Sequence, residues 1–120
     1  MRHSIALCVT ILMLAAKPAN AAPAPAASDW VQVPNLGGRF CVDRASIRSG
    51  QPVTFFWKEC DSSDDVSEQD RLDCSQDLSK DFVMDYRFDQ SSEWKSDHYG
   101  PGEPGAVIGA YVCGLVAKAS

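Results

Sequence analysis

The sequence predicts a small α+β domain in which a β-sheet is followed by a C-terminal α-helix, held to one face of the sheet by a disulfide. Three observations lead to this fold class: runs of alternating apolar and polar residues in the middle of the chain, four cysteines after residue 21, and an apolar segment that begins after Pro104. The 120-residue chain has room for one such domain and not for a second.

Residues 1–21 are typical of a cleaved secretory signal peptide. A positively charged start precedes an almost continuously apolar run at residues 5–16, and Ala19 and Ala21 form the small-residue pattern that signal peptidase recognises. The apolar run is too short for a permanent membrane-spanning helix. We therefore predict cleavage after Ala21 and an exported protein, located in the periplasm, on the cell surface or outside the cell.

The mature chain is expected to comprise a flexible Pro/Ala-rich lead at residues 22–28 and a single domain at residues 29–120. Cleavage removes Arg2 and Lys17, so 9 basic and 16 acidic residues remain and the net charge is −7. This balance argues against nucleic acid and anionic membrane surfaces as partners, because both are bound through a basic face.

Alternation along the chain identifies the strands of the sheet. In residues 81–89, the apolar Phe82 and Met84 alternate with Asp85 and Arg87, which is the pattern of a half-buried strand. β-Branched and aromatic residues mark residues 53–60 as a second strand. Further strands are expected at residues 30–33, 39–43, 71–76 and 93–95.

The cysteines that remain after the signal peptide are Cys41, Cys60, Cys74 and Cys113. An even number in a small exported domain indicates two disulfides, and the absence of a Cys-x-x-Cys pair argues against a zinc site. Because strand residues alternate between faces, Cys41 and Cys60 are expected on the outer face of a hairpin and Cys74 on the inner face. We therefore predict a Cys41–Cys60 bond and a Cys74–Cys113 bond.

The hexamer GPGEPG at residues 100–105 matches the Gly-x-Gly-x-x-Gly fingerprint of dinucleotide-binding loops. The 15 residues that follow it are too few for the helix and returning strand of a βαβ unit. In addition, Pro101 and Pro104 lack the N–H groups that a phosphate would need. We therefore expect no nucleotide or other cofactor, and we interpret the hexamer as the start of the C-terminal helix.

The C-terminal helix has one side of small residues and one side of larger apolar residues. The small side consists of Ala106, Gly109, Ala110, Cys113 and Ala117. We expect this side to face the sheet, because a disulfide requires the two backbones to approach closely. The larger side, which includes Ile108, Tyr111 and Val112, would then be buried under a loop or against a second copy of the chain.

Several motifs follow one another in a characteristic order. They are a tryptophan near the mature start, VDRASIRSG at residues 42–50, RLDCS at residues 71–75, Trp94, and PGEPGAVIGAYVCG at residues 101–114. This order resembles the surface-adhesin protein E family of bacterial exported proteins. The resemblance implies an antiparallel sheet of about six strands with the helix tethered to its concave face. Named members of that family bind host matrix and serum proteins such as laminin and vitronectin.

The sequence contains no G-x-S-x-G or H-E-x-x-H motif and leaves no mature cysteine free to act as a nucleophile. We interpret Asp97 and His98 as a solvated loop pair. Residues 61–70 do not fit the EF-hand template, and we interpret them as a disordered acidic loop. We therefore expect a non-enzymatic module, without metal or cofactor, that binds an extracellular protein. The alternative is a soluble periplasmic structural or envelope protein without a host ligand.

Overall fold

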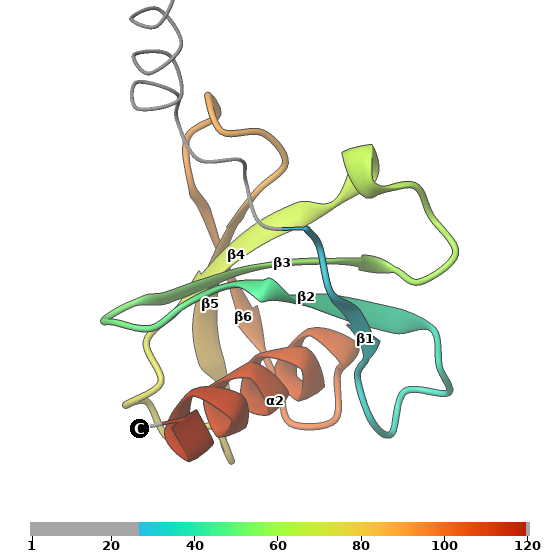
Figure 1. The fold of residues 1–120 in the computed structure, drawn as a ribbon. Coiled ribbons are helices and arrows are strands. Elements are labelled where there is room, and N and C mark those ends of the chain that lie inside the picture. The colour runs from blue at the N-terminus through green and yellow to red at the C-terminus, as the bar shows by residue number, and fades with distance from the viewer. Residues whose placement is uncertain (1–26, 120) are drawn as a thin grey trace, which may run out of the picture.

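The computed structural model describes residues 27–119. In this range, six antiparallel strands form a single sheet in which each strand pairs with the next one along the chain. The strands are β1 (Trp30–Gln32), β2 (Phe40–Arg48), β3 (Val53–Glu59), β4 (Glu68–Leu72), β5 (Phe82–Arg87) and β6 (Lys95–Tyr99). Helix α2 (Pro104–Ala119) lies across one face of this sheet (Figure 1). The predicted fold class is therefore confirmed.

The predicted signal peptide at residues 1–21, with its cleavage site at Ala21, lies outside the described residues, as does most of the Pro/Ala-rich lead. Within residues 27–119, no helix is both long and apolar enough to cross a membrane.

β5 shows how the alternation in the sequence produces the two faces of the sheet. Phe82 and Met84 are buried against α2. The residues that follow each of them, Val83 and Asp85, lie on the other face and are only partly buried. We call the face that packs against α2 the inner face and the opposite one the outer face.

Three strands differ from their predicted bounds by more than two residues at one or both ends. β4 begins at Glu68 and ends at Leu72, so that Cys74 lies in the turn after the strand and not within it. β2 continues to Arg48, and β6 begins at Lys95, where the sequence pattern suggested that a strand would end. The physical reason for the β4 shift is that residues 68–72 pair with β3 from Val53 to Trp57, which outweighs the low strand propensity of Glu and Asp.

Residues 61–70 are ordered, contrary to the disordered acidic loop that their composition suggests. Asp64–Val66 form a short 3-10 helix, η1, and the segment then continues into β4. The buried Lys58 ammonium donates a hydrogen bond to the carbonyl of Ser62 at 2.6 Å and pairs with Asp64 at 3.0 Å. A cation beneath the loop therefore offsets part of its negative charge and ties it to β3.

Both predicted disulfides are present. Cys41 in β2 and Cys60, the residue after β3, form one bond, with their Cα atoms 5.0 Å apart. Cys74 and Cys113 join the turn after β4 to the middle of α2, with their Cα atoms 5.7 Å apart. The second bond tethers the helix to the sheet, as the cysteine positions predict.

The side of α2 that faces the sheet differs from the predicted one. Ala106 and Gly109 are buried as expected, but Ala110 is exposed, and Ile108 and Val112 from the larger side are buried instead. Because Gly109 has no side chain, the helix lies very close to the sheet at this point. The side chains of Ile108 and Val112 therefore also reach the inner face of the sheet. Close packing then requires large side chains beside the small one, because small residues alone would leave a void.

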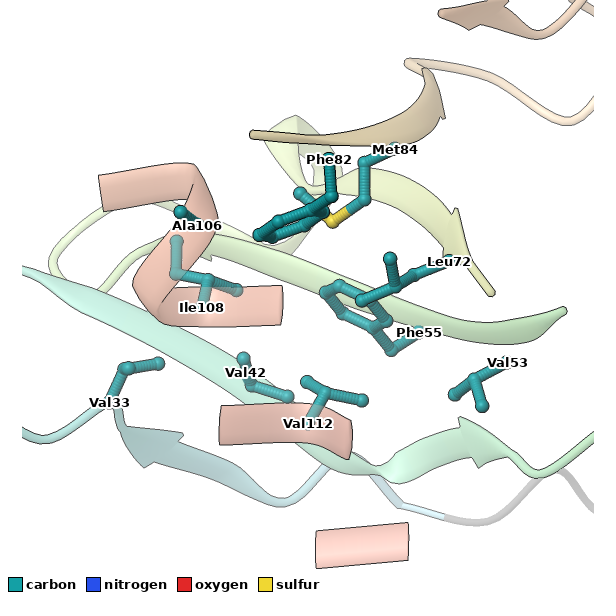
Figure 2. Packing of buried hydrophobic residues seen from close by; sticks show 10 residues of the cluster. All are labelled: Val33, Val42, Val53, Phe55, Leu72, Phe82, Met84, Ala106, Ile108 and Val112. Carbon is teal, nitrogen blue, oxygen red and sulfur yellow. The ribbon is translucent and has the colours of Figure 1, made fainter. Parts of the chain in front are cut away.

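The core lies between α2 and the inner face, as Figure 2 shows. Ile108 and Val112 of the helix point into a layer of strand side chains in this view. The strand residues of that layer are Val42, Val53, Phe55, Leu72, Phe82 and Met84, and Val33, the residue after β1, completes it.

We predict that Gly109→Leu destabilises the domain by about 1–3 kcal/mol or more through overpacking. A Cβ atom at this position would lie 3.0 Å from Cδ2 of Leu72 and 3.1 Å from Sδ of Met84. Gly114→Leu is the matched control, because a Cβ atom there meets nothing within 4 Å. Urea unfolding should show a lower midpoint for the Gly109 variant only. Equal midpoints would contradict the close approach of α2 to the sheet.

Candidate functional site: an arginine–tryptophan cluster on the outer face

The outer face of β4, β5 and β6 carries polar side chains, because the alternation that buries one residue exposes the next. The pairing register brings Gln69 opposite Arg87, Arg71 opposite Asp85, and Asp85 opposite Ser96. α2 covers the other face, so this surface is left open. Two arginines from adjacent strands are thereby placed close together.

Trp94, in the connection between β5 and β6, lies against both arginines. The guanidinium carbon of Arg71 is 4.4 Å from the centroid of its ring, and that of Arg87 is 4.2 Å away. Both distances are within the range of cation–π attraction, which is strongest for tryptophan. We call Arg71, Arg87 and Trp94 the Trp94 cluster.

A carboxylate fixes the first arginine. Nε of Arg71 donates to Oδ2 of Asp85 at 2.7 Å, and Oγ of Ser96 donates to Oδ1 of the same carboxylate at 2.5 Å. Burial on its own would raise the pKa of Asp85, but the hydrogen bonds from Ser96 and Arg71 outweigh it and hold that pKa below its ordinary value. Asp85 therefore remains ionised and holds Arg71 in place at neutral pH.

Two glutamines fix the second arginine. Nε of Arg87 donates to Oε1 of Gln69 at 2.9 Å, and a terminal nitrogen of Arg87 donates to Oε1 of Gln90 at 3.2 Å. Gln90 in turn donates to Oε1 of Gln69 at 3.0 Å. Side chains already held in one geometry lose less conformational entropy when a partner binds.

The Trp94 cluster has the composition that carries binding energy at protein interfaces. Tryptophan and arginine are the residues most enriched among positions whose truncation costs the most affinity. Trp94, Arg71 and Arg87 are each partly buried, so each is held by the domain and still presents surface to a partner.

The residues singled out in the sequence have other places in the structure. All four mature cysteines are in structural disulfides. Asp97 and His98 lie in β6 and not in a loop, and because strand neighbours point to opposite faces they do not form an acid–base pair. His98 is exposed opposite Val83, and Asp97 is on the inner side opposite Met84. Within residues 27–119, no three His, Cys, Asp or Glu side chains are grouped so that they could hold a metal ion.

Sequence reasoning missed Arg71, Arg87 and Trp94 as one site. The signal was present, because both arginines occupy polar positions of predicted strands. The register between β4 and β5 could not be predicted from the sequence. This register places the two arginines next to each other, beneath the same tryptophan.

Comparison with protein-family models, with curated proteins and with solved structures finds no match to this chain.

Proposed function

We propose that this protein is an exported, non-enzymatic binding module that recognises an extracellular protein through the Trp94 cluster. The observation that carries the proposal is the position of two immobilised arginines against one tryptophan on the uncovered face of the sheet. The order of sequence motifs that resembles surface-adhesin protein E supports host matrix or serum proteins as the ligand class. Two disulfides in a domain of this size also fit a protein that works in an oxidising compartment.

The chemistry of the cluster indicates what a ligand must offer. Arg71 is paired with Asp85, whereas Arg87 forms hydrogen bonds only to neutral groups, those of Gln69 and Gln90, among the contacts within residues 27–119. Arg87 can therefore accept a carboxylate from a partner without first losing an ion pair. We expect the partner to present an acidic side chain beside an apolar one that packs on Trp94.

Trp94→Ala is expected to weaken binding to the partner by about 2 kcal/mol, or roughly 30-fold, because truncation removes the ring that the partner would cover. The mature, oxidised domain would be measured by biolayer interferometry against immobilised vitronectin and laminin. His98→Ala is the matched control, since His98 is an exposed residue of the outer face that forms no hydrogen bond, ion pair or ring contact with the cluster. It should bind like the wild type and keep the same fold.

Two results would contradict the proposal in different ways. Equal binding by the Trp94 and His98 variants would mean that the ligand uses another surface. No binding of the wild type to either probe would reject this ligand class and favour a periplasmic protein without a host ligand. Protease treatment of intact cells distinguishes these locations directly, because an exposed domain is digested and a periplasmic one is protected.

A further inference from the structure

A second recessed site lies on the inner face, beside the first turn of α2. It is a cavity of about 290 Å³ at the end of the core where the helix begins. This volume is near the lower end of the range of about 300–1,000 Å³ for small-molecule sites. The cavity belongs to the face opposite the Trp94 cluster, so its function is independent of protein binding there.

Asp70 is the most unusual residue of this cavity. Its side chain is 1% exposed, and its Oδ1 atom has no hydrogen-bond partner among the described residues. Burial raises the pKa of the Asp70 carboxyl to about 10. A side-chain hydrogen bond with Glu68 and the negative charge of Glu68 both raise this pKa further. A buried, unsatisfied polar atom costs free energy, so its presence at a cavity wall needs an explanation.

The ionisable side chains that line the cavity are acidic or phenolic. Glu68 and Asp97 line it together with Asp70, and no lysine or arginine does so. Burial raises the pKa of the Tyr99 hydroxyl, and the charges of Asp70, Glu68 and Asp97 raise it further. Trp57 donates its indole N–H to Oε2 of Glu68 at 3.0 Å, which fixes that carboxylate at the cavity wall.

The remaining wall is aromatic. Phe40, Trp57, Tyr86 and Tyr99 all line the cavity, and the rings of Phe40 and Trp57 meet edge to face with their centroids 5.7 Å apart. Aromatic rings combined with carboxylates are the surroundings that attract an organic ammonium group, because the ring faces and the oxygens both carry negative potential.

The start of α2 also borders the cavity, and the partial positive charge of a helix N-terminus opposes a cation there. Its first residue, Pro104, has no N–H to present to a ligand. Next to it, the carboxylate of Glu103 accepts a hydrogen bond from the backbone N–H of Gly100 at 2.6 Å. Glu68 and Asp97 are therefore the side chains of the cavity wall that can balance the charge of a cation.

We propose that this cavity binds a small aliphatic primary amine in its ammonium form. The unpartnered Oδ1 of Asp70 accepts an N–H of the ammonium group, the carboxylate of Glu68 balances its charge, and the four rings surround its alkyl chain. A primary amine is favoured over a quaternary one, because only a primary amine has the N–H donors that Oδ1 lacks.

The test is a titration of the mature, oxidised domain with n-butylammonium chloride at pH 7, followed by NMR. We expect saturable shifts of the Trp57 indole N–H and of the Tyr86 and Tyr99 ring signals. Neither tetramethylammonium nor n-butanol should compete, because the first has no donor and the second has no charge.

Asp70→Ala, which removes the acceptor Oδ1, should weaken butylammonium binding at least about tenfold, whereas Asp61→Ala at an exposed position should not. Trp94→Ala should bind butylammonium like the wild type, which separates this site from the outer face. The proposal is overturned if butylammonium leaves the cavity signals unchanged, if tetramethylammonium or n-butanol binds equally well, or if the Asp70 variant binds like the wild type.

Discussion

Asp70→Asn is expected to stabilise the ligand-free domain at pH 7 by up to about 4 kcal/mol. Burial raises the pKa of this carboxyl from its ordinary value of 3.8 to about 10 in the folded state, and each unit of difference corresponds to about 1.36 kcal/mol. The folded protein therefore holds a proton at pH 7 that the unfolded chain has released. An amide needs no such proton, so folding of the variant does not carry this cost.

The same pKa shift sets the sign of the pH dependence. The stability linked to the Asp70 proton is fully present below about pH 4 and is lost progressively as the pH rises toward about 10. The groups that face Asp70 are Glu68, Asp97, Tyr86 and Tyr99 from the sheet, and α2 contributes no ionisable group to the cavity wall. Urea unfolding at pH 5, 7 and 9 should show declining stability in the wild type and a much smaller decline in the asparagine variant.

Asp61→Asn is the control for this experiment, because it removes one carboxylate from an exposed position. It should follow the wild-type pH dependence. If the asparagine variant at position 70 were less stable than the wild type at pH 7 and kept the same slope, Asp70 would be an ionised, well-compensated carboxylate.

Cys113→Ser is expected to destabilise the oxidised domain by about 2–5 kcal/mol. The Cys74–Cys113 bond spans 39 residues in sequence, and the loop-closure relation gives about 4 kcal/mol for a loop of that length. Because this bond tethers α2 to the sheet, its loss should lower the melting temperature and free the thiol of Cys74, which a maleimide would then label.

Cys41→Ser provides the comparison within the same chain. Its bond spans 19 residues, for which the same relation gives about 3 kcal/mol. We therefore expect the wild type to have the highest melting temperature, the Cys41 variant a lower one, and the Cys113 variant the lowest. The reverse order would mean that the hairpin bond contributes more than the helix tether.

Much of the fold is readable from the sequence because its main features depend on local patterns. The period of two in β5 predicts the two faces of the sheet. The predicted disulfide pairing is also correct, although Cys74 lies in the turn after β4 and not in a strand as its parity assumed. Local sequence patterns do not predict which side of α2 faces the sheet. Small residues there are consistent with close approach, but the choice between Ala110 and Ile108 depends on the surface beneath the helix.

The sites were harder to predict because both depend on the pairing of β4. Residues 61–70 look like an acidic loop, yet Glu68–Leu72 pair with β3 and β5 in a register that buries Asp70 on the inner face. The same register places Arg71 on the outer face beneath Trp94. No local sequence pattern distinguishes an acidic residue in a solvated loop from one that becomes buried in the core because its segment pairs with a neighbouring strand.

Cross-saturation NMR on the complex tests the proposed outer-face binding most directly. The isotope-labelled, oxidised domain would be mixed with unlabelled vitronectin or laminin, whichever binds, and saturation of the partner would be transferred to labelled atoms at the interface. We expect the largest losses at the Trp94 indole N–H and at the Arg71 and Arg87 side chains, with little change on α2. Losses that concentrate on α2 or on Tyr86 and Tyr99, with Trp94 unaffected, would contradict binding through the outer face.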